Sequence, residues 1–375
     1  MGCTCMPEPA LLHTPRGWLD IAETLAAGAE AVDRGSRNLA PELALLAQQG
    51  LLAEPARPVG PDGRWLAAGA GEWLADTLFA LGRVSLPLAR LYEGHVDALG
   101  LIWNHGNDQM RRRGICLASA GQLLGVWGAD DPQAPVVCEP AARGGHTLRG
   151  RKLFASGLGL VQRAIVTARN PAGALCLFMV DASDPARQDA TAWDMGGMVG
   201  SASGGYMFEG LHVADEDQIG PAGVLFTEPH FHGGLWRICA IQAGALAGIA
   251  EHLAAHLRQR GQDNDALQRQ RLAQLVLAAE SARLWADSAA LAVAAPFAPA
   301  SAIERPLLAR EAIDRMAMAG LDACERAAGT TLHSRSSAMG RMVRDLRLYL
   351  RQASLDAKLD TALGLWWDAL DAGRR

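Results

Sequence analysis

The order of secondary structure along this chain constrains its fold more than any single residue does. Residues 148–223 are typical of β-strands, whereas the long Ala- and Leu-rich segments on both sides are typical of helices. The apolar runs 164–168 and 174–180 are bounded by Gly, Pro and Asp, as buried strands are. Glycine pairs supply turns around a further run at 206–213. The sequence therefore predicts a small β module between two helical blocks.

The flanking segments carry apolar residues at three- and four-residue spacing, which predicts helices. Before the module this spacing covers residues 18–33, 39–52 and 65–106, with a Pro- and Gly-rich loop at 53–64. After the module it covers 234–260, 268–291, 306–328 and 339–353. Short connections between four such helices predict an antiparallel bundle. Small residues in the first of them allow neighbouring helices to approach closely.

We therefore predict an α+β fold in three parts. Residues 1–114 form an N-terminal helical domain, 115–225 a central small β-barrel-like domain, and 226–375 a C-terminal four-helix bundle. A chain of 375 residues is long enough for these units to share a substantial core.

The composition is that of a folded protein without a strong charge preference. Half of the residues are hydrophobic, a fifth are charged, and 35 basic against 40 acidic residues give a net charge of −5. Nucleic acid is not an expected partner at that charge. Seven scattered cysteines indicate a reducing compartment, and the absence of a signal peptide or a run of 18 apolar residues predicts a cytoplasmic protein without membrane insertion.

Motifs of residue type alone do not identify a chemistry. The glycine-rich residues 196–205 lie between strands and do not open a helix, so they indicate turns and not a dinucleotide site. His252 and His256 lie four apart on a helix but lack the glutamate of hydrolytic metal sites, and Cys3 and Cys5 have no second ligand pair. We therefore predict no metal.

Four segments, in their order and spacing, resemble the acyl-CoA dehydrogenase family of flavoproteins. They are RKLFASGLGLVQRAIVTAR at 151–169, SASGGYMFEGLHVADEDQIGPAG at 201–223, LAQLVLAAESARL at 272–284 and MGRMVRDL at 339–346. The resemblance extends over nearly the whole chain. It implies FAD as cofactor, bound between the β domain and the bundle, with a neighbouring subunit completing the adenine end.

The resemblance also implies which residues contact the flavin. Their residue types suit a flat polarisable ring that is closely approached by backbone, and a diphosphate that is held by arginine. By position these residues are Trp127, Gly128, Phe154, Ser156, Gly157, Arg260, Gly329 and Thr330.

The chain departs from the family at the catalytic base. Dehydrogenation of an acyl thioester needs a carboxylate to remove the α-proton. The two positions at which family members carry that glutamate are Ala353 and Trp236 here, and neither side chain accepts a proton. Substitute bases are conceivable, and the candidates are Glu93, Glu228 and Asp356. Relatives that insert oxygen need no such base, and many carry a histidine where this chain has Gln352.

Three functions follow as hypotheses. The first is an FAD-dependent oxidoreductase that transfers hydride from an acyl thioester or carrier-bound acyl group to flavin. Its electron acceptor would be a flavoprotein or oxygen. The second is a flavin-dependent monooxygenase on the same scaffold, and the third is a non-catalytic binding protein that retains the fold. The resemblance further implies a homodimer or homotetramer, with which the small-residue faces of the long helices are compatible.

Overall fold

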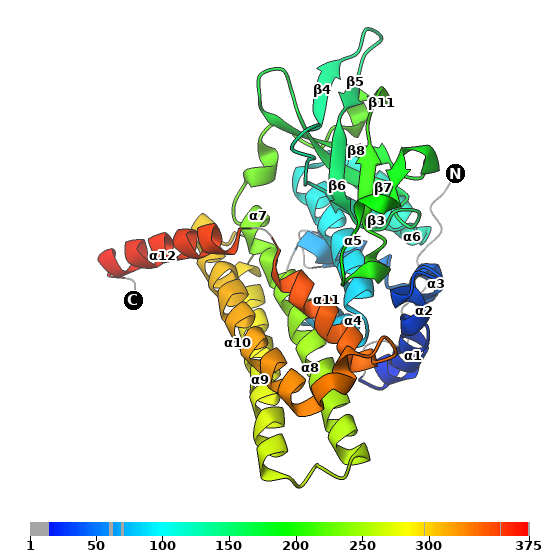
Figure 1. The fold of residues 1–375 in the computed structure, drawn as a ribbon. Coiled ribbons are helices and arrows are strands. Elements are labelled where there is room, and N and C mark those ends of the chain that lie inside the picture. The colour runs from blue at the N-terminus through cyan, green and yellow to red at the C-terminus, as the bar shows by residue number, and fades with distance from the viewer. Residues whose placement is uncertain (1–14, 60–62, 69–70, 296, 353, 374–375) are drawn as a thin grey trace.

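The computed structural model describes residues 15–59, 63–68, 71–295, 297–352 and 354–373. Figure 1 shows the β module at one end of the molecule, the long helices of the C-terminal region at the other, and helices α4 and α5 between them. The N-terminal elements are α1 Pro15–Ala27, α2 Ala29–Asp33, α3 Ala40–Gln48, β1 Pro58–Val59, β2 Arg64–Trp65, α4 Glu72–Val84, α5 Leu86–His105 and α6 Asp108–Ser119.

The central module contains two sheets. Its strands are β3 Leu124–Trp127, β4 Val137–Pro140, β5 His146–Arg149, β6 Arg151–Ala155, β7 Arg163–Arg169, β8 Leu175–Asp181, β9 Gln188–Asp189, β10 Gly204–Met207 and β11 Leu211–Val213. One sheet has the order β11-β5-β4-β7-β3, with β8 on β7, and the other has the order β6-β10-β9. The strands β7 and β8, which the apolar runs predicted, are confirmed and pair antiparallel, with Val166 opposite Phe178.

The C-terminal region is helical. Its elements are α7 His230–Gly233, α8 Leu235–Gln259, α9 Ala266–Val293, α10 Glu304–Ala328, α11 Ala338–Leu350 and α12 Leu355–Asp371. Helices α8 to α11 confirm the four predicted bundle helices, and the α+β class is confirmed with them. In Figure 1, α12 projects from the end of the bundle. The three domain boundaries stay predictions.

Close packing of α4 against α8 depends on glycine. A Cβ atom at Gly244 would lie 2.1 Å from the carbonyl oxygen of Phe79, and one at Gly82 would lie 2.2 Å from that of Ile241. The predicted role of small residues in this helix is therefore confirmed. By length and composition, residues 230–259 could cross a membrane, but 67% of the most apolar window is buried inside the protein, as in a core helix.

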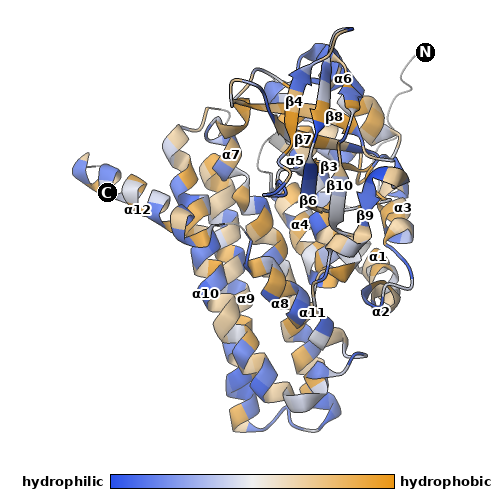
Figure 2. Cartoon of the chain, turned by 45° about the horizontal axis from the view of Figure 1, so that its top comes forward, coloured by the Kyte–Doolittle hydropathy of each residue, from blue (hydrophilic) through white to orange (hydrophobic). Residues whose placement is uncertain are grey.

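The arrangement of apolar residues separates the two kinds of element. Figure 2 shows strands β7 and β8 coloured largely as hydrophobic, whereas the long helices α9 and α10 alternate hydrophobic and hydrophilic residues. Strands β7 and β8 are buried over most of their length, so both of their faces are covered. The module therefore has a well-packed core around these two strands.

Several predicted elements were wrong in extent. The expected helix 65–106 is interrupted, because Ser85 is extended and caps α5 while Pro87 is tolerated only in the first helical turn. The loop 53–64 contains β1, which pairs with β2. The run 206–213 divides into β10 and β11 at a turn where Gly210 has a φ of +67°. Residues 115–119, which we expected in the β module, belong to α6, and the first strand of the module is β3.

Candidate functional site

A cavity of about 580 Å³ lies where the β module meets helices α5 and α11. Its volume is within the range of small-molecule and cofactor sites. Helix α5 contributes Arg90, and α11 with the residues after it contributes Leu348, Tyr349, Arg351 and Gln352. The module contributes the remaining residues, which are Val126, Gly128, Ala129, Phe154, Ser156, Trp193, Met195, Met198, Ser201 and Ser203.

The module side of the cavity carries no charged side chain among these lining residues. Phe154 and Trp193 meet edge to face, with ring centroids 5.9 Å apart. Phe154 is 51% exposed although it is aromatic, so part of its ring is open to a ligand. An apolar, partly aromatic wall of this kind suits a flat ring system.

A chain of hydroxyl groups crosses this wall. Ser203 Oγ donates to Ser156 Oγ at 3.0 Å and lies 2.7 Å from Ser201 Oγ, which donates to the Met198 carbonyl at 2.7 Å. Each hydroxyl is both a donor and an acceptor. The chain therefore offers polar contacts along the otherwise apolar wall.

The backbone around the cavity adopts conformations that ordinary residues avoid. Among the described residues, Phe154, Met198, Ala202 and Ser354 are the non-glycine residues with positive φ, between +45° and +61°. Phe154 and Met198 line the cavity, Ala202 lies between two lining serines, and Ser354 follows shortly after Gln352. Such conformations cost roughly 1–3 kcal/mol each and cluster at functional sites. Their gathering here marks the cavity as the candidate site.

Helix α11 holds the loop that forms part of this wall. The Asp345 carboxylate accepts the Met198 N–H at 2.5 Å, and Arg344 Nε donates to the Gly196 carbonyl at 3.2 Å. Gly197 packs against the same turn, because a Cβ there would lie 2.7 Å from the Arg344 carbonyl oxygen. Burial raises the pKa of Asp345 to about 7. One turn of α11 thus fixes the backbone from Gly196 to Met198.

Hydrogen bonds that involve a buried arginine hold the C-terminal end of α11. Arg310 on α10 donates from Nη1 to Gln242 Oε1 at 2.7 Å and from Nη2 to the Leu350 carbonyl at 3.3 Å. Gln242 in turn reaches the Tyr349 carbonyl at 3.5 Å. These bonds satisfy carbonyls that the helix end leaves free. The helical residues that line the cavity are therefore held in place.

A row of charged residues, buried at Glu93 and partly exposed at Arg90 and Asp97, runs along one face of α5 behind the cavity. Arg90, Glu93 and Asp97 occupy positions i, i+3 and i+7, so they share a face. Arg90 Nη1 donates to Glu93 Oε2 at 2.9 Å, and Arg237 of α8 pairs with Glu93 Oε1 at 3.7 Å and with Asp97. Burial raises the pKa of Glu93, with the negative charge of Asp97 adding to the shift and the two arginines opposing it.

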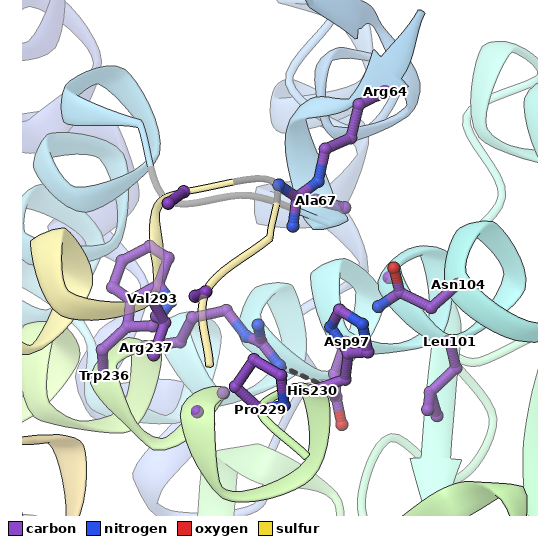
Figure 3. Close-up of a pocket in the computed structure, with 15 residues that line it drawn as sticks. Arg64, Ala67, Asp97, Leu101, Asn104, Pro229, His230, Trp236, Arg237 and Val293 are labelled. Atoms are coloured by element: carbon purple, nitrogen blue, oxygen red, sulfur yellow. Dashed lines mark hydrogen bonds and ion pairs between the residues drawn. The ribbon is translucent and has the colours of Figure 1, made fainter. Parts of the chain in front are cut away.

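A second, smaller pocket of about 80 Å³ lies at the far end of this row. Figure 3 shows Arg237 paired with Asp97 in this pocket, with Arg64, Asn104 and His230 around the hollow. Trp236 lines it and is buried. The row from Arg90 to Asp97 therefore connects two cavities.

Three of the residues expected to bind flavin line the large cavity, and two lie directly behind it. Gly128, Phe154 and Ser156 are in the lining. Trp127 is buried, and its indole Nε1 donates to the Ser156 carbonyl at 3.0 Å. Gly157, with a φ of +83°, donates its N–H to the Ser201 carbonyl at 2.8 Å.

The other three expected residues do not line the cavity. Arg260 is the exposed C-cap of α8, and Gly329 and Thr330 are exposed just after α10. The structure therefore does not bring them together with the first five. Because the resemblance assigns Gly329 and Thr330 to the cofactor of a neighbouring subunit, their roles stay predictions, as does that of Arg260.

None of the candidate bases lines the cavity. Glu93 lies behind Arg90, Glu228 accepts hydrogen bonds from the backbone and side chain of His232, and Asp356 is exposed on α12. Trp236 is buried against the second pocket, and Ala353 lies outside the described residues. Among the described residues, the lining of the large cavity contains no Asp, Glu or His.

Sequence reasoning identified three of the fifteen lining residues as flavin contacts and missed the other twelve. Arg90 and Tyr349 lie on helices whose apolar periodicity gives no sign of a site, and Trp193 and Met195 lie in a segment without a motif. The glycine-rich residues 196–205 were interpreted as turns, which they are, but they also carry lining residues. The serines of SASGG were the available signal.

A metal centre has no support in the described part of the chain. No three His, Cys, Asp or Glu side chains gather there in a way that could hold an ion. His252 and His256 are both on α8, and burial lowers the pKa of His252. Cys3 and Cys5 lie outside the described residues.

The comparisons with known proteins bear on the fold. No protein-family model matches this sequence, and no curated protein matches it either. Solved structures do match at TM-scores between 0.75 and 0.79. TdsC of Paenibacillus sp. A11-2, in complex with FMN and indole, has a TM-score of 0.77 and 19% identity over 93% of this chain and 95% of its own.

Two further structures match to a similar extent. Butyryl-CoA dehydrogenase of Megasphaera elsdenii has a TM-score of 0.79 and 16% identity over 98% of this chain and all of its own. A nitrososynthase of Micromonospora carbonacea var. africana has a TM-score of 0.77 and 19% identity over 95% of this chain and 98% of its own. The chain shares one fold with these proteins over nearly its full length. The fold that the sequence resemblance implied is confirmed.

Proposed function

We propose that this chain, which has the fold of acyl-CoA dehydrogenases, is a flavin-dependent oxidoreductase whose flavin binds in the cavity of about 580 Å³. The observation that carries the proposal is the convergence of strained backbone, an aromatic pair and a hydroxyl chain on that one cavity. One structure of the same fold, TdsC, is described with FMN. A cytoplasmic location remains part of the proposal.

The residues present fit a flavin ring. A Cβ at Gly128 would meet open space, so a planar group can approach the backbone there. Phe154 and Trp193 would cover the ring, and Ser156 would reach its polar edge. Whether the flavin is FAD or FMN depends on Arg260, Gly329 and Thr330, which lie away from the cavity. We retain FAD on the resemblance.

Within this class, monooxygenation is the chemistry that the cavity supports best. When bound, reduced flavin would supply the two electrons by which one oxygen atom of O₂ enters the substrate and the other leaves as water. The lining has no carboxylate or imidazole among the described residues, so no group there is placed to remove a substrate α-proton. The chain's own residues would orient the substrate and exclude water, and the serine chain would hold protons along the wall.

Acyl-thioester dehydrogenation is the second candidate, and Glu93 is the observation that favours it. This carboxylate is buried next to Arg90, which lines the cavity, and burial raises its pKa, as at many catalytic carboxylates. To act, Glu93 would have to exchange its pairing with Arg90 for contact with the substrate. The monooxygenase needs no such rearrangement.

Spectroscopy on the purified protein separates these functions. A yellow protein with flavin absorbance supports the class, whereas a colourless protein that binds neither FAD nor FMN supports the non-catalytic alternative. Anaerobic titration with butyryl- and octanoyl-CoA bleaches a dehydrogenase. Oxygen uptake that requires NAD(P)H and a separate flavin reductase supports the monooxygenase, and bleaching by acyl-CoA would overturn it. If the protein is a monooxygenase, a flavin reductase supplies the electrons and oxygen accepts them.

We also propose that the protein is a homo-oligomer that associates through α9. Leu277, Leu284 and Leu291 recur every seven residues on this helix and are 65%, 71% and 75% exposed. The face of α9 that packs inside the protein is instead made largely of alanines. An apolar helix face that meets no other element is typical of association with a second copy.

A further inference from the structure

We infer that Arg90 and Tyr349 form an oxyanion-binding end of the large cavity, and that the substrate is a compact, ring-sized molecule with a carboxylate or phenolate group. This inference rests on the proposed function, because it names the substrate class of the same site. It follows from a difference in chemistry between the two walls of the cavity and from the charges behind one of them.

The helical wall is rich in hydrogen-bond donors. Arg90, Tyr349, Arg351 and Gln352 line it, and no acidic side chain does so among the described residues. The opposite wall is neutral, as the aromatic pair and the serine chain show. A ligand that spans the cavity therefore meets a neutral surface on one side and the two arginines on the other.

Of the two arginines in this wall, Arg90 is the less exposed, at 20% against 53% for Arg351, which pairs with Asp314. A guanidinium has five N–H groups in a fixed fork, which matches a planar oxyanion in two places. One hydrogen bond runs from Nη1 to Glu93. Arg90 also lines the cavity, so its other N–H groups can donate to a bound oxygen atom without breaking that bond.

Tyr349 supports Arg90 as a neutral donor. Its side chain is buried, and burial raises the pKa of the phenol well above its usual value, with the charge of Glu93 adding to the effect. The hydroxyl therefore stays protonated and can donate to an oxyanion at any ordinary pH. Both Tyr349 and Arg90 line the same large cavity.

The row of charges behind Arg90 limits the length of the substrate. Beyond Arg90 the next groups are Glu93, Arg237 and Asp97, which are paired with one another and lead to the second pocket (Figure 3). A hydrocarbon chain that continued past Arg90 would have to displace buried ion pairs, which is strongly unfavourable. The cavity is therefore closed to long acyl chains at this end.

The test is a calorimetric titration of the flavin-loaded protein with benzoate, benzamide and octanoate. Benzoate and benzamide have the same size and shape, but only benzoate carries an oxyanion. We expect benzoate to bind at least tenfold more tightly than either of the other two. Equal affinity for benzoate and benzamide, or no binding of benzoate, would overturn the inference.

Variants locate the binding group. Arg90→Gln should weaken benzoate binding at least tenfold and Tyr349→Phe severalfold, whereas Arg83→Gln, at a surface ion pair with Glu251, should leave it unchanged. If Arg90→Gln leaves Glu93 unpaired and fails to fold, the double variant R90Q/E93Q replaces the ion pair with two amides. Unchanged benzoate affinity in a folded Arg90 variant sinks the inference.

The same titration without flavin separates this inference from the proposed function. A protein that binds no flavin but binds benzoate through Arg90 contradicts the proposed function and supports the oxyanion site. Competition between benzoate and flavin would show that Arg90 belongs to the flavin site, and it would overturn the inference while the proposed function stands.

Discussion

Asp345 occupies a position where burial opposes its charge. Its carboxylate accepts the Met198 N–H, and the other charged groups that face it are Asp33 of α2 and Arg341 and Arg344 of its own helix. The pKa is raised from 3.8 to about 7. The folded state therefore binds this proton more tightly than the unfolded chain does. That stabilisation is complete below pH 3.8 and is lost as the pH rises through about 7.

Replacing Asp345 by asparagine tests this linkage. An amide oxygen can accept the same hydrogen bond but does not titrate, so Asp345→Asn should be more stable than the wild type at pH 8, by up to the order of 4 kcal/mol. The difference should narrow as the pH falls to 5 and vanish only below about pH 3.8. Urea unfolding between pH 5 and 8 measures it, with Asp356→Asn on the exposed α12 as control. A difference that does not vary with pH would refute the linkage.

Gly157 and Gly173 form a matched pair that tests whether the tight packing around Gly157, directly behind the cavity, contributes to stability. Both have φ near +80°, so alanine at either position carries a conformational cost of roughly 1–2 kcal/mol. A Cβ at Gly157 would also lie 2.7 Å from Val161 Cγ2, whereas one at Gly173 would meet nothing within 4 Å. Gly157→Ala should therefore lower the free energy of unfolding by ~1–3 kcal/mol more than Gly173→Ala. Equal losses in urea unfolding would contradict this.

At this scale the sequence predicted the residues that sit in a motif and missed those that do not. Phe154 and Ser156 were found because a short segment carries the resemblance, and Gly128 because its position follows from it. Arg90 and Tyr349 look like ordinary helix residues, since their place at a cavity depends on how α5 and α11 meet the module. This packing is a tertiary contact, and no local sequence pattern indicates it.

The loop from Gly196 to Ser203 shows how one element positions another. Turn residues of the loop are fixed by α11, and the next turn of the same helix lines the cavity. The predictions for β7 and β8 succeeded because each is a continuous apolar run with clear ends, and those for the bundle helices because their apolar spacing is regular. The break at Ser85 and the existence of α12 escaped prediction, because a cap and an outlying helix change the apolar pattern very little.

Gly197→Ala should loosen the hold of α11 on this loop. Its Cβ would meet the Arg344 carbonyl oxygen at 2.7 Å, while one at Gly196 would meet nothing within 4 Å. We expect Gly197→Ala to weaken flavin binding about tenfold, equivalent to ~1.4 kcal/mol, and Gly196→Ala to preserve it. Quenching of flavin fluorescence gives both affinities. Equal affinities for the two variants would show that the contact does not shape the site.

At the scale of the whole molecule, the described residues leave the apolar face of α9 formed by Leu277, Leu284 and Leu291 largely exposed. Replacing Leu284 of α9 by glutamate places a charge in the centre of the exposed leucines. We expect this variant to have a lower molar mass by light scattering after gel filtration. Leu370→Glu, at an exposed position on α12, serves as control. An unchanged mass for Leu284→Glu, or a monomeric wild type, would contradict association through α9.

Helix α5 borders both cavities, and this has a consequence for how distant substitutions act. Asp97 lies two turns from Arg90, yet a series of side-chain ion pairs connects them: Asp97 pairs with Arg237, Arg237 with Glu93, and Glu93 with Arg90. Removing the carboxylate at 97 would free Arg237 to draw Glu93 towards itself and so release Arg90. An evolutionary change in the small pocket can therefore retune substrate preference in the large one while every residue that touches the substrate stays the same.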